Sequence, residues 1–313
     1  MGIVLVSATL FGLMAVLVGV ACRNLPATQV AFVRFAGSLV VLLAMTRGRG
    51  LRPTPGKSLQ VVLRGLLGAG SIVLYYHAIH DAGAGFATLL FSVYPVWTAV
   101  FAATLGGERV DARLVAALAL GVAGVIVVLG PGVELGGATL SGGLAAVAAS
   151  VFAGGAVTSA RQLRLTETAV LVTTHFMAVG AVVTAPAVLR GVSPISPALL
   201  LVLVGVVLTS LGGQLLLHEG LGFVSATEGS LAAATSVAVA TGLQALWLGE
   251  RIGAAGLAGA ALLFAAVAVA AGRSSASEPP GPDPVRPRAE CWHQGPKASM
   301  IEAQPRGAKW PTP

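Results

Sequence analysis

Ionisable side chains inside apolar stretches are the residues of this sequence best placed to do chemistry. Arg34 lies about two helical turns into the apolar stretch 27–46, and Glu228 lies one to two turns into the stretch 223–248. An ionised side chain at the centre of a bilayer costs about 2.5–3.5 kcal/mol on insertion scales, so such residues are functional candidates. Arg34 could attract a carboxylate, or its side chain could extend to the headgroups. Glu228 could take up a proton or pair with a cationic substrate, or it could be solvated near the membrane surface.

A second group of candidates gathers at the end of the third apolar stretch. Tyr75, Tyr76, His77 and His80 immediately precede Asp81. Residues three or four positions apart share a helix face, so the two histidines could form a protonatable pair. The tyrosines could instead anchor the helix at the membrane interface. No further ligand lies nearby in the sequence, so we predict no metal site.

Aromatic and uncharged polar residues complete the set of candidates. Tyr94, Pro95 and Trp97 could line a cavity, because a proline within a span leaves a backbone carbonyl without its helical partner. Three further polar residues could either line that cavity or bond to a neighbouring helix: His175, Gln214 and Gln244.

The composition indicates what kind of protein must position these side chains. The chain has 313 residues, of which 56% are apolar and 10% are charged, and its mean hydropathy is +0.87. Soluble domains carry about 25% charged residues. A soluble globular domain and a disordered chain are therefore excluded, and a polytopic membrane protein is indicated. The net charge of +7 is explained by basic loops on the cytoplasmic side, without nucleic-acid binding.

Ten apolar stretches are long enough to cross a membrane as helices, since a crossing takes about 20 residues. They are separated by breaks that contain Pro, Gly or charged residues, which are turn signals. The stretches are 2–20, 27–46, 59–79, 84–105, 113–130, 140–160, 168–189, 198–217, 223–248 and 254–272. The fold class is therefore predicted to be an all-α integral membrane protein. Residues 273–313 are rich in Pro, Ser and Gly, which predicts a disordered cytoplasmic tail.

Basic residues in the short breaks predict the orientation of the chain. With both termini in the cytoplasm, the inner segments contain Arg47, Arg49, Arg52, Lys57, Arg109, Arg113, Arg161, Arg164 and Arg273. The outer segments then contain only Arg23, Arg190 and Arg251. We therefore predict a multi-pass protein of the plasma (inner) membrane with a cytoplasmic N-terminus and C-terminus.

The two halves of the chain repeat one another. The sequence Leu-Gly-Gly-Glu-Arg-Val at 105–110 recurs as Trp-Leu-Gly-Glu-Arg-Ile at 247–252, a shift of 142 residues. Each half, 1–130 and 131–272, then has five spans. Because five is odd, the second half must enter the membrane in the opposite orientation. Inverted repeats are typical of secondary transporters, with the substrate site between the halves.

Several motifs also resemble the EamA-type branch of the drug/metabolite transporter superfamily. They are the pair Arg34-Phe35, the stretch 87–95 followed by Gly-Glu-Arg at 107–109, the small-residue span around 119–125, and the second copy of this arrangement. The resemblance covers about residues 2–272. It implies ten helices and the movement of small metabolites, often by export. Two positions depart from the family pattern, Val237 in place of a proline and Phe11 in place of a tryptophan.

These features favour a secondary transporter that exports small organic metabolites by alternating access, with proton coupling as one option. The expected partners are a small-molecule substrate and the lipid bilayer, without cofactor or nucleic acid. A membrane-embedded enzyme is the first alternative, for which only His77, His80 and Asp81 cluster. A non-transporting membrane scaffold with a partner site on its basic tail is the second.

Overall fold

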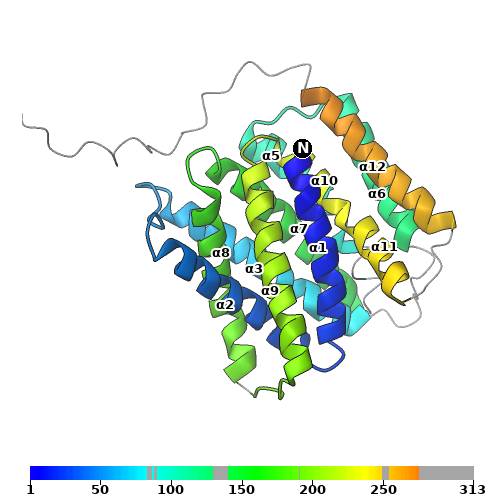
Figure 1. The fold of residues 1–313 in the computed structure, drawn as a ribbon. Coiled ribbons are helices and arrows are strands. Elements are labelled where there is room, and N and C mark those ends of the chain that lie inside the picture. The colour runs from blue at the N-terminus through cyan, green and yellow to red at the C-terminus, as the bar shows by residue number, and fades with distance from the viewer. Residues whose placement is uncertain (83–86, 88–89, 130–139, 190, 249–253, 275–313) are drawn as a thin grey trace, which may run out of the picture. The chain divides into compact units, whose positions relative to one another are not determined.

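The computed structural model describes residues 1–82, 87, 90–129, 140–189, 191–248 and 254–274. All regular elements in these ranges are α-helices. Their bounds are α1 Gly2–Ala21, α2 Ala27–Thr46, α3 Ser58–Ala82, α5 Tyr94–Gly106, α6 Ala112–Leu129, α7 Leu140–Leu163, α8 Ala169–Leu189, α9 Pro197–Gly220, α10 Ala226–Ala234, α11 Ser236–Leu248 and α12 Ala254–Ser274. Figure 1 shows their arrangement.

Local sequence explains where these helices begin and end. The side chain of Ser196 accepts a hydrogen bond from the backbone N–H of Leu199 at the start of α9. Ser225 and Glu228 form a reciprocal capping box at the start of α10. Gly107 ends α5 with a φ of 69°, a conformation that glycine adopts without strain.

In the described part of the chain, six helices are long and apolar enough to cross a membrane: α1, α2, α3, α7, α8 and α9. Shorter apolar helices occur at 112–127 in α6 and at 257–270 in α12. The chain is therefore a multi-pass membrane protein, as the composition predicted.

The ninth predicted span is not one continuous helix. The stretch 223–248 divides into α10 and α11, and Thr235 lies between them. The hydroxyl and the backbone N–H of Thr235 both donate to the carbonyl of Ala232, three residues earlier. These bonds replace the regular α-helical bond to the residue four positions earlier, so the helix is interrupted here. In the fourth span, 84–105, a regular helix begins at Tyr94, directly before Pro95. A proline favours this position because it has no N–H to donate.

The eighth span was predicted to end too early. Helix α9 continues past position 217 to Gly220, so His218 and Glu219 belong to the helix and not to the following turn. The charged and glycine residues at 218–222 had suggested a break, but the N–H of Leu221 still bonds to the carbonyl of Leu217. The predicted tail begins inside α12, and residues 275–313 lie outside the described part of the chain.

The helices of the two halves correspond at the predicted shift of 142 residues. Helices α2 and α8 begin at 27 and 169, α5 and α11 at 94 and 236, and α6 and α12 at 112 and 254. Both α5 and α11 are 13 residues long. The packing corresponds as well: α3 packs on α7 as α9 packs on α1, and α5 packs on α7 as α11 packs on α1. Helices α6 and α12, which correspond to each other, lie side by side (Figure 1).

Two glycine contacts repeat this correspondence in atomic detail. A Cβ placed on Gly154 of α7 would lie 2.6 Å from Cβ of Trp97 in α5. A Cβ placed on Gly12 of α1 would lie 2.7 Å from Cγ1 of Val239 in α11. The two glycines are 142 residues apart, and so are their partners. At both crossings the missing side chain allows close approach of the helices, as is common in membrane proteins.

Candidate functional site

A buried polar cluster joins α3, α8 and α9, with Arg64 at its centre. Arg64 is only 4% exposed. Its Nη2 lies 3.0 Å from Nε2 of His218, and its guanidinium carbon lies 4.5 Å from the centre of the Phe176 ring. The other guanidinium nitrogens, Nε and Nη1, are buried and have no hydrogen-bond partner in the described part of the chain. Arg64 therefore carries a buried positive charge whose hydrogen-bonding capacity is only partly used.

The hydrogen bonds around His218 determine its proton position. Because Nη2 of Arg64 can only donate, Nε2 of His218 must accept, and the ring proton lies on Nδ1. Nδ1 lies 2.7 Å from Oγ1 of Thr173, which donates its own hydrogen to the carbonyl of Ala169. The amide nitrogen of Gln214 also lies 3.1 Å from Nε2. The neutral imidazole therefore holds Arg64 without supplying a negative charge.

A second buried arginine, Arg34 of α2, lies against the same helix α9. It is 7% exposed, and its Nε donates a hydrogen bond of 2.6 Å to Oγ of Ser210. The phenol of Tyr76 interacts with the same guanidinium. The guanidinium carbon lies 5.5 Å from the centre of the Phe35 ring. The structure therefore brings together Arg34 and Tyr76, two of the residues selected from the sequence.

Two buried phenylalanines connect the arginines. The rings of Phe35 and Phe176 meet edge to face, with centroids 5.4 Å apart and an interplanar angle of 89°. Both residues are buried. One ring lies beside Arg34 and the other beside Arg64, so the four side chains form a continuous series through the packed helices.

The aromatic candidate Tyr94 lies at the junction of α5 and α10. Its hydroxyl donates a hydrogen bond of 3.0 Å to the carbonyl of Ser230. Its ring lies 5.6 Å from that of Phe91, which lies 4.6 Å from that of Tyr75. Tyr94 therefore connects the two halves of the chain. The other aromatic candidate, Trp97, is half-buried and packs at the Gly154 crossing.

The histidine candidates lie apart from the buried arginines. The side chain of His77 is 59% exposed and lies 3.3 Å from Asp81, one helical turn away. His175 is half-buried, and its Nδ1 donates to the carbonyl of Leu171 in the same helix. The side chains of His80 and Gln244 lie outside the described residues. Within the described ranges, no three His, Cys, Asp or Glu residues gather in a way that could hold a metal ion.

The acidic candidate Glu228 lies closer to the end of its helix than predicted. It is the third residue of α10, in the first turn, and it is 5% exposed. Its carboxylate accepts a hydrogen bond of 3.0 Å from the N–H of Ser225. Glu108, from the first half of the chain, accepts from the N–H of Ala226 at 2.7 Å. Two carboxylates thus stabilise the start of one buried helix, where the helix dipole favours negative charge.

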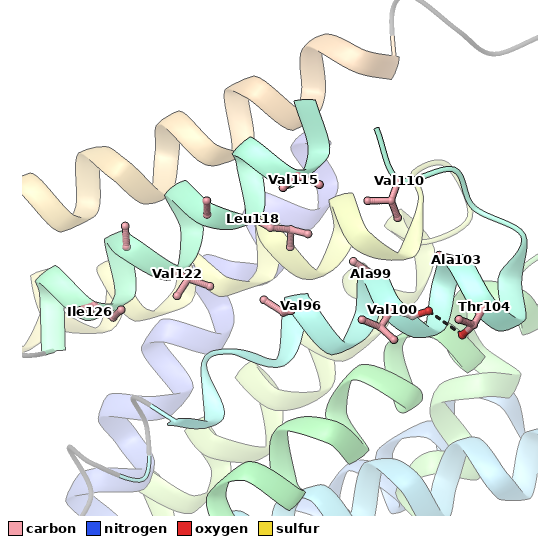
Figure 2. A pocket seen from close by; sticks show the side chains of 12 residues that line it. Val96, Ala99, Val100, Ala103, Thr104, Val110, Val115, Leu118, Val122 and Ile126 are labelled. Carbon is pink, nitrogen blue, oxygen red and sulfur yellow. Dashed lines mark hydrogen bonds between the residues drawn. The ribbon is translucent and has the colours of Figure 1, made fainter. Parts of the chain in front are cut away.

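A large apolar groove runs between α5 and α6 (Figure 2). Its volume is about 800 Å³, and eleven of its twelve lining residues are apolar. The twelfth, Thr104, turns its hydroxyl back to the carbonyl of Val100 at 2.8 Å, as Figure 2 shows. A groove with no free polar group suits hydrocarbon chains and offers nothing to orient a polar metabolite. We therefore place the candidate site at the buried arginines.

Sequence analysis missed Arg64 and its partner His218. Arg64 lies inside the predicted span 59–79, so the same rule that selected Arg34 could have selected it. His218 was assigned to a turn because the predicted span ended at 217. Only the packing shows that the two side chains meet across 154 residues of sequence.

Comparison with known proteins places this chain among transporters. The model of the EamA-like transporter family matches residues 1–130 and 140–272. The pseudopaline exporter CntI of Pseudomonas aeruginosa strain UCBPP-PA14 is 30% identical over 223 residues, which are 69% of this chain and 76% of that protein. Its counterpart in strain PAO1 is 29% identical over the same shares.

A solved crystal structure of another protein shares the fold. It superposes with a TM-score of 0.73 and 23% sequence identity, over 87% of this chain and 96% of the other. The resemblance noted from the Gly-Glu-Arg motifs and the Arg34-Phe35 pair is thereby confirmed, because the family model extends over both halves. The chain belongs to the EamA-like transporter family.

Proposed function

We propose that this protein is a secondary exporter of small organic metabolites across the bacterial plasma membrane and works by alternating access. The main support is the correspondence of helices and helix packings at a shift of 142 residues. The most extensive packings, α3–α7, α6–α12 and α1–α9, each join one half to the other. Repeated halves with an interface of this kind are typical of secondary transporters that alternate between two states. The family match and the export named for the two relatives agree with this proposal.

In this proposal the halves are inverted five-span repeats, 1–130 and 131–272. The contacts α2–α8 and α6–α12 support it, because each joins a helix to its own counterpart. Such contacts arise where a two-fold axis passes between equivalent elements. The two-segment family match has nearly the same boundaries.

The native cysteines allow a direct test of topology. Cys22 is exposed directly after α1, and Cys291 lies in the tail. With cytoplasmic termini, an impermeant maleimide added to intact cells should label Cys291→Ser protein through Cys22 and should not label Cys22→Ser protein. The protein atoms around the exposed Cys22 still desolvate its thiol and raise the pKa of that thiol, so labelling is best done at mildly alkaline pH. Labelling of Cys291 in intact cells would contradict the proposed orientation.

Transport itself is tested in proteoliposomes. We expect counterflow of at least one labelled amino acid, amine or weak acid, and no counterflow in empty liposomes. Absence of counterflow for all three classes with folded protein would count against the exporter.

We further propose that Glu228 couples export to protons. Glutamine also fits the third position of a capping box, so Glu228→Gln should keep the start of α10 intact while removing the titratable group. We expect this variant to retain counterflow and to lose the response to a pH gradient. An unchanged response would exclude Glu228 as the coupling residue.

A further inference from the structure

Arg64 has buried hydrogen-bond donors that no described residue accepts from. A guanidinium has five N–H donors in a rigid plane, and burial removes the water that would otherwise bind them. In Arg64 only Nη2 has a partner, the neutral His218. Gly68, one turn along α3, leaves the space in which Nη1 lies, because a Cβ there would meet both Nη1 and the Phe176 ring.

Arg164 is a useful comparison, because it is an arginine whose side-chain nitrogens all have hydrogen-bond partners. Its Nη2 lies 3.1 Å from a carboxylate oxygen of Glu219, and its Nε donates to the carbonyl of His218 at 2.8 Å. Its Nη1 donates to the carbonyl of Glu167. All three nitrogens of Arg164 are used, and one partner carries a negative charge. Arg64 has neither feature.

Arg34 has the same deficit of negative charge. Its partners are the hydroxyls of Ser210 and Tyr76. Among the described residues, no carboxylate forms an ion pair with Arg34 or Arg64. Two buried cations that no described carboxylate neutralises indicate a site where the opposite charge arrives with a ligand.

The two arginines lie at different depths. Helices α2 and α3 follow one another and run in opposite directions, and each arginine lies six or seven residues after the start of its helix. Their partners on α9, Ser210 and His218, are eight residues apart, about 12 Å along the helix axis. The edge-to-face rings of Phe35 and Phe176 lie between them.

We propose that Arg64 and Arg34 are two successive binding positions for a carboxylate group of the transported molecule, with the Phe35–Phe176 pair closing the path between them. The proposal rests on the transport function proposed above and adds the substrate class. In this conformation Arg64 is held by His218. A carboxylate would engage the Nη2 hydrogen that His218 does not accept, together with the free nitrogen on the same edge of the guanidinium, Nε or Nη1. This is the two-point geometry that guanidinium groups favour.

The test uses succinate as an anionic probe and succinamide as its uncharged analogue, with the purified full-length protein in detergent at constant ionic strength. We expect succinate to raise the Tm and succinamide to leave it unchanged. Arg64→Gln should weaken the apparent affinity for succinate at least tenfold. The matched control is Arg49→Gln, which removes an exposed loop arginine and should leave the affinity unchanged.

Three results would overturn the proposal: no Tm shift with succinate, an equal shift with succinamide, or an equal affinity in Arg64→Gln protein. If Arg64→Gln does not fold, Arg64→Lys keeps the charge but loses the two-point geometry and should still bind at least tenfold more weakly. Different results would overturn the transport proposal. Succinate binding without counterflow of any compound would leave the site standing and exclude the exporter, whereas counterflow without succinate binding would do the reverse.

Discussion

The surroundings of Arg34 and of Phe176 are two versions of one arrangement. The two residues are 142 positions apart, on the corresponding helices α2 and α8. Arg34 meets Ser210 of α9, and Phe176 meets Gly68 of α3, where a Cβ would lie 2.6 Å from the ring. Ser210 and Gly68 are also 142 positions apart. The same helix crossing thus holds a hydrogen-bonded cation in one half and an aromatic ring in the other.

The same correspondence relates Tyr76 to His218, which are again 142 positions apart. Tyr76 interacts with Arg34 of α2, whereas His218 accepts from Arg64 of α3, whose own counterpart is Val206. Both arginines therefore belong to the first half, on the neighbouring helices α2 and α3, and the equivalent positions of the second half are Phe176 and Val206. The backbone arrangement is repeated while the charges are not, so a few side chains can set substrate chemistry without altering the scaffold.

The largest expected loss of stability distinguishes His218 from Tyr76, the residue at the equivalent position of the first half. His218→Leu removes the one hydrogen-bond acceptor that Arg64 has among the described residues and should lower the free energy of unfolding by about 3 kcal/mol. Tyr76→Leu should cost less, because Arg34 keeps Ser210. Denaturation of the purified proteins measures both. Adding Arg64→Met to His218→Leu should recover most of the loss, and a further loss in the double variant would contradict the assignment.

A smaller effect is expected at the two glycine crossings. Gly154→Leu and Gly12→Leu should each lower the free energy of unfolding by about 1–3 kcal/mol, because both crossings are too close for a side chain. Gly19→Leu is the control, since nothing lies within 4 Å of a Cβ there. Thermal denaturation provides the measurement. Unequal losses at the two crossings would weaken the correspondence between α1 and α7.

Removing the hydroxyl beside Arg34 should have a moderate effect. Ser210→Ala leaves Nε of Arg34 without its 2.6 Å partner and should cost about 1.5–2 kcal/mol, typical of a hydrogen bond to a charged group. Ser38→Ala, which removes a bond between α2 and α9 to the carbonyl of Val207, should cost about 0.6 kcal/mol. Equal losses in the two variants would mean that the bond from Arg34 to Ser210 is no stronger than the bond from Ser38 to a backbone carbonyl.

The smallest effect is expected at the exposed pair of His77 and Asp81. His77→Ala should change the free energy of unfolding by less than about 0.5 kcal/mol, because exposed ion pairs contribute little. Counterflow should persist. Loss of counterflow in a stable His77→Ala protein would move the functional site away from the buried arginines and to this end of α3.

Much of the fold could be predicted from the sequence, but only part of the candidate site. The start of α2 at 27, that of α12 at 254 and the shift of 142 residues agree with the sequence patterns. Arg34 was selected because it lies deep in an apolar span. The divided ninth span was missed, because the turn at Thr235 contains neither glycine nor proline and depends on bonds to Ala232.

The sequence by itself determined that the chain crosses the membrane many times, and that its halves share one pattern. These are local properties, because about 20 consecutive apolar residues suffice for a crossing. Tertiary structure decided which side chains share an interior. Arg34 and Ser210 are 176 positions apart, and Arg64 and His218 are 154 positions apart. Whether a buried charge is satisfied depends on atoms brought within about 3 Å by helix packing, and no local pattern contains that information.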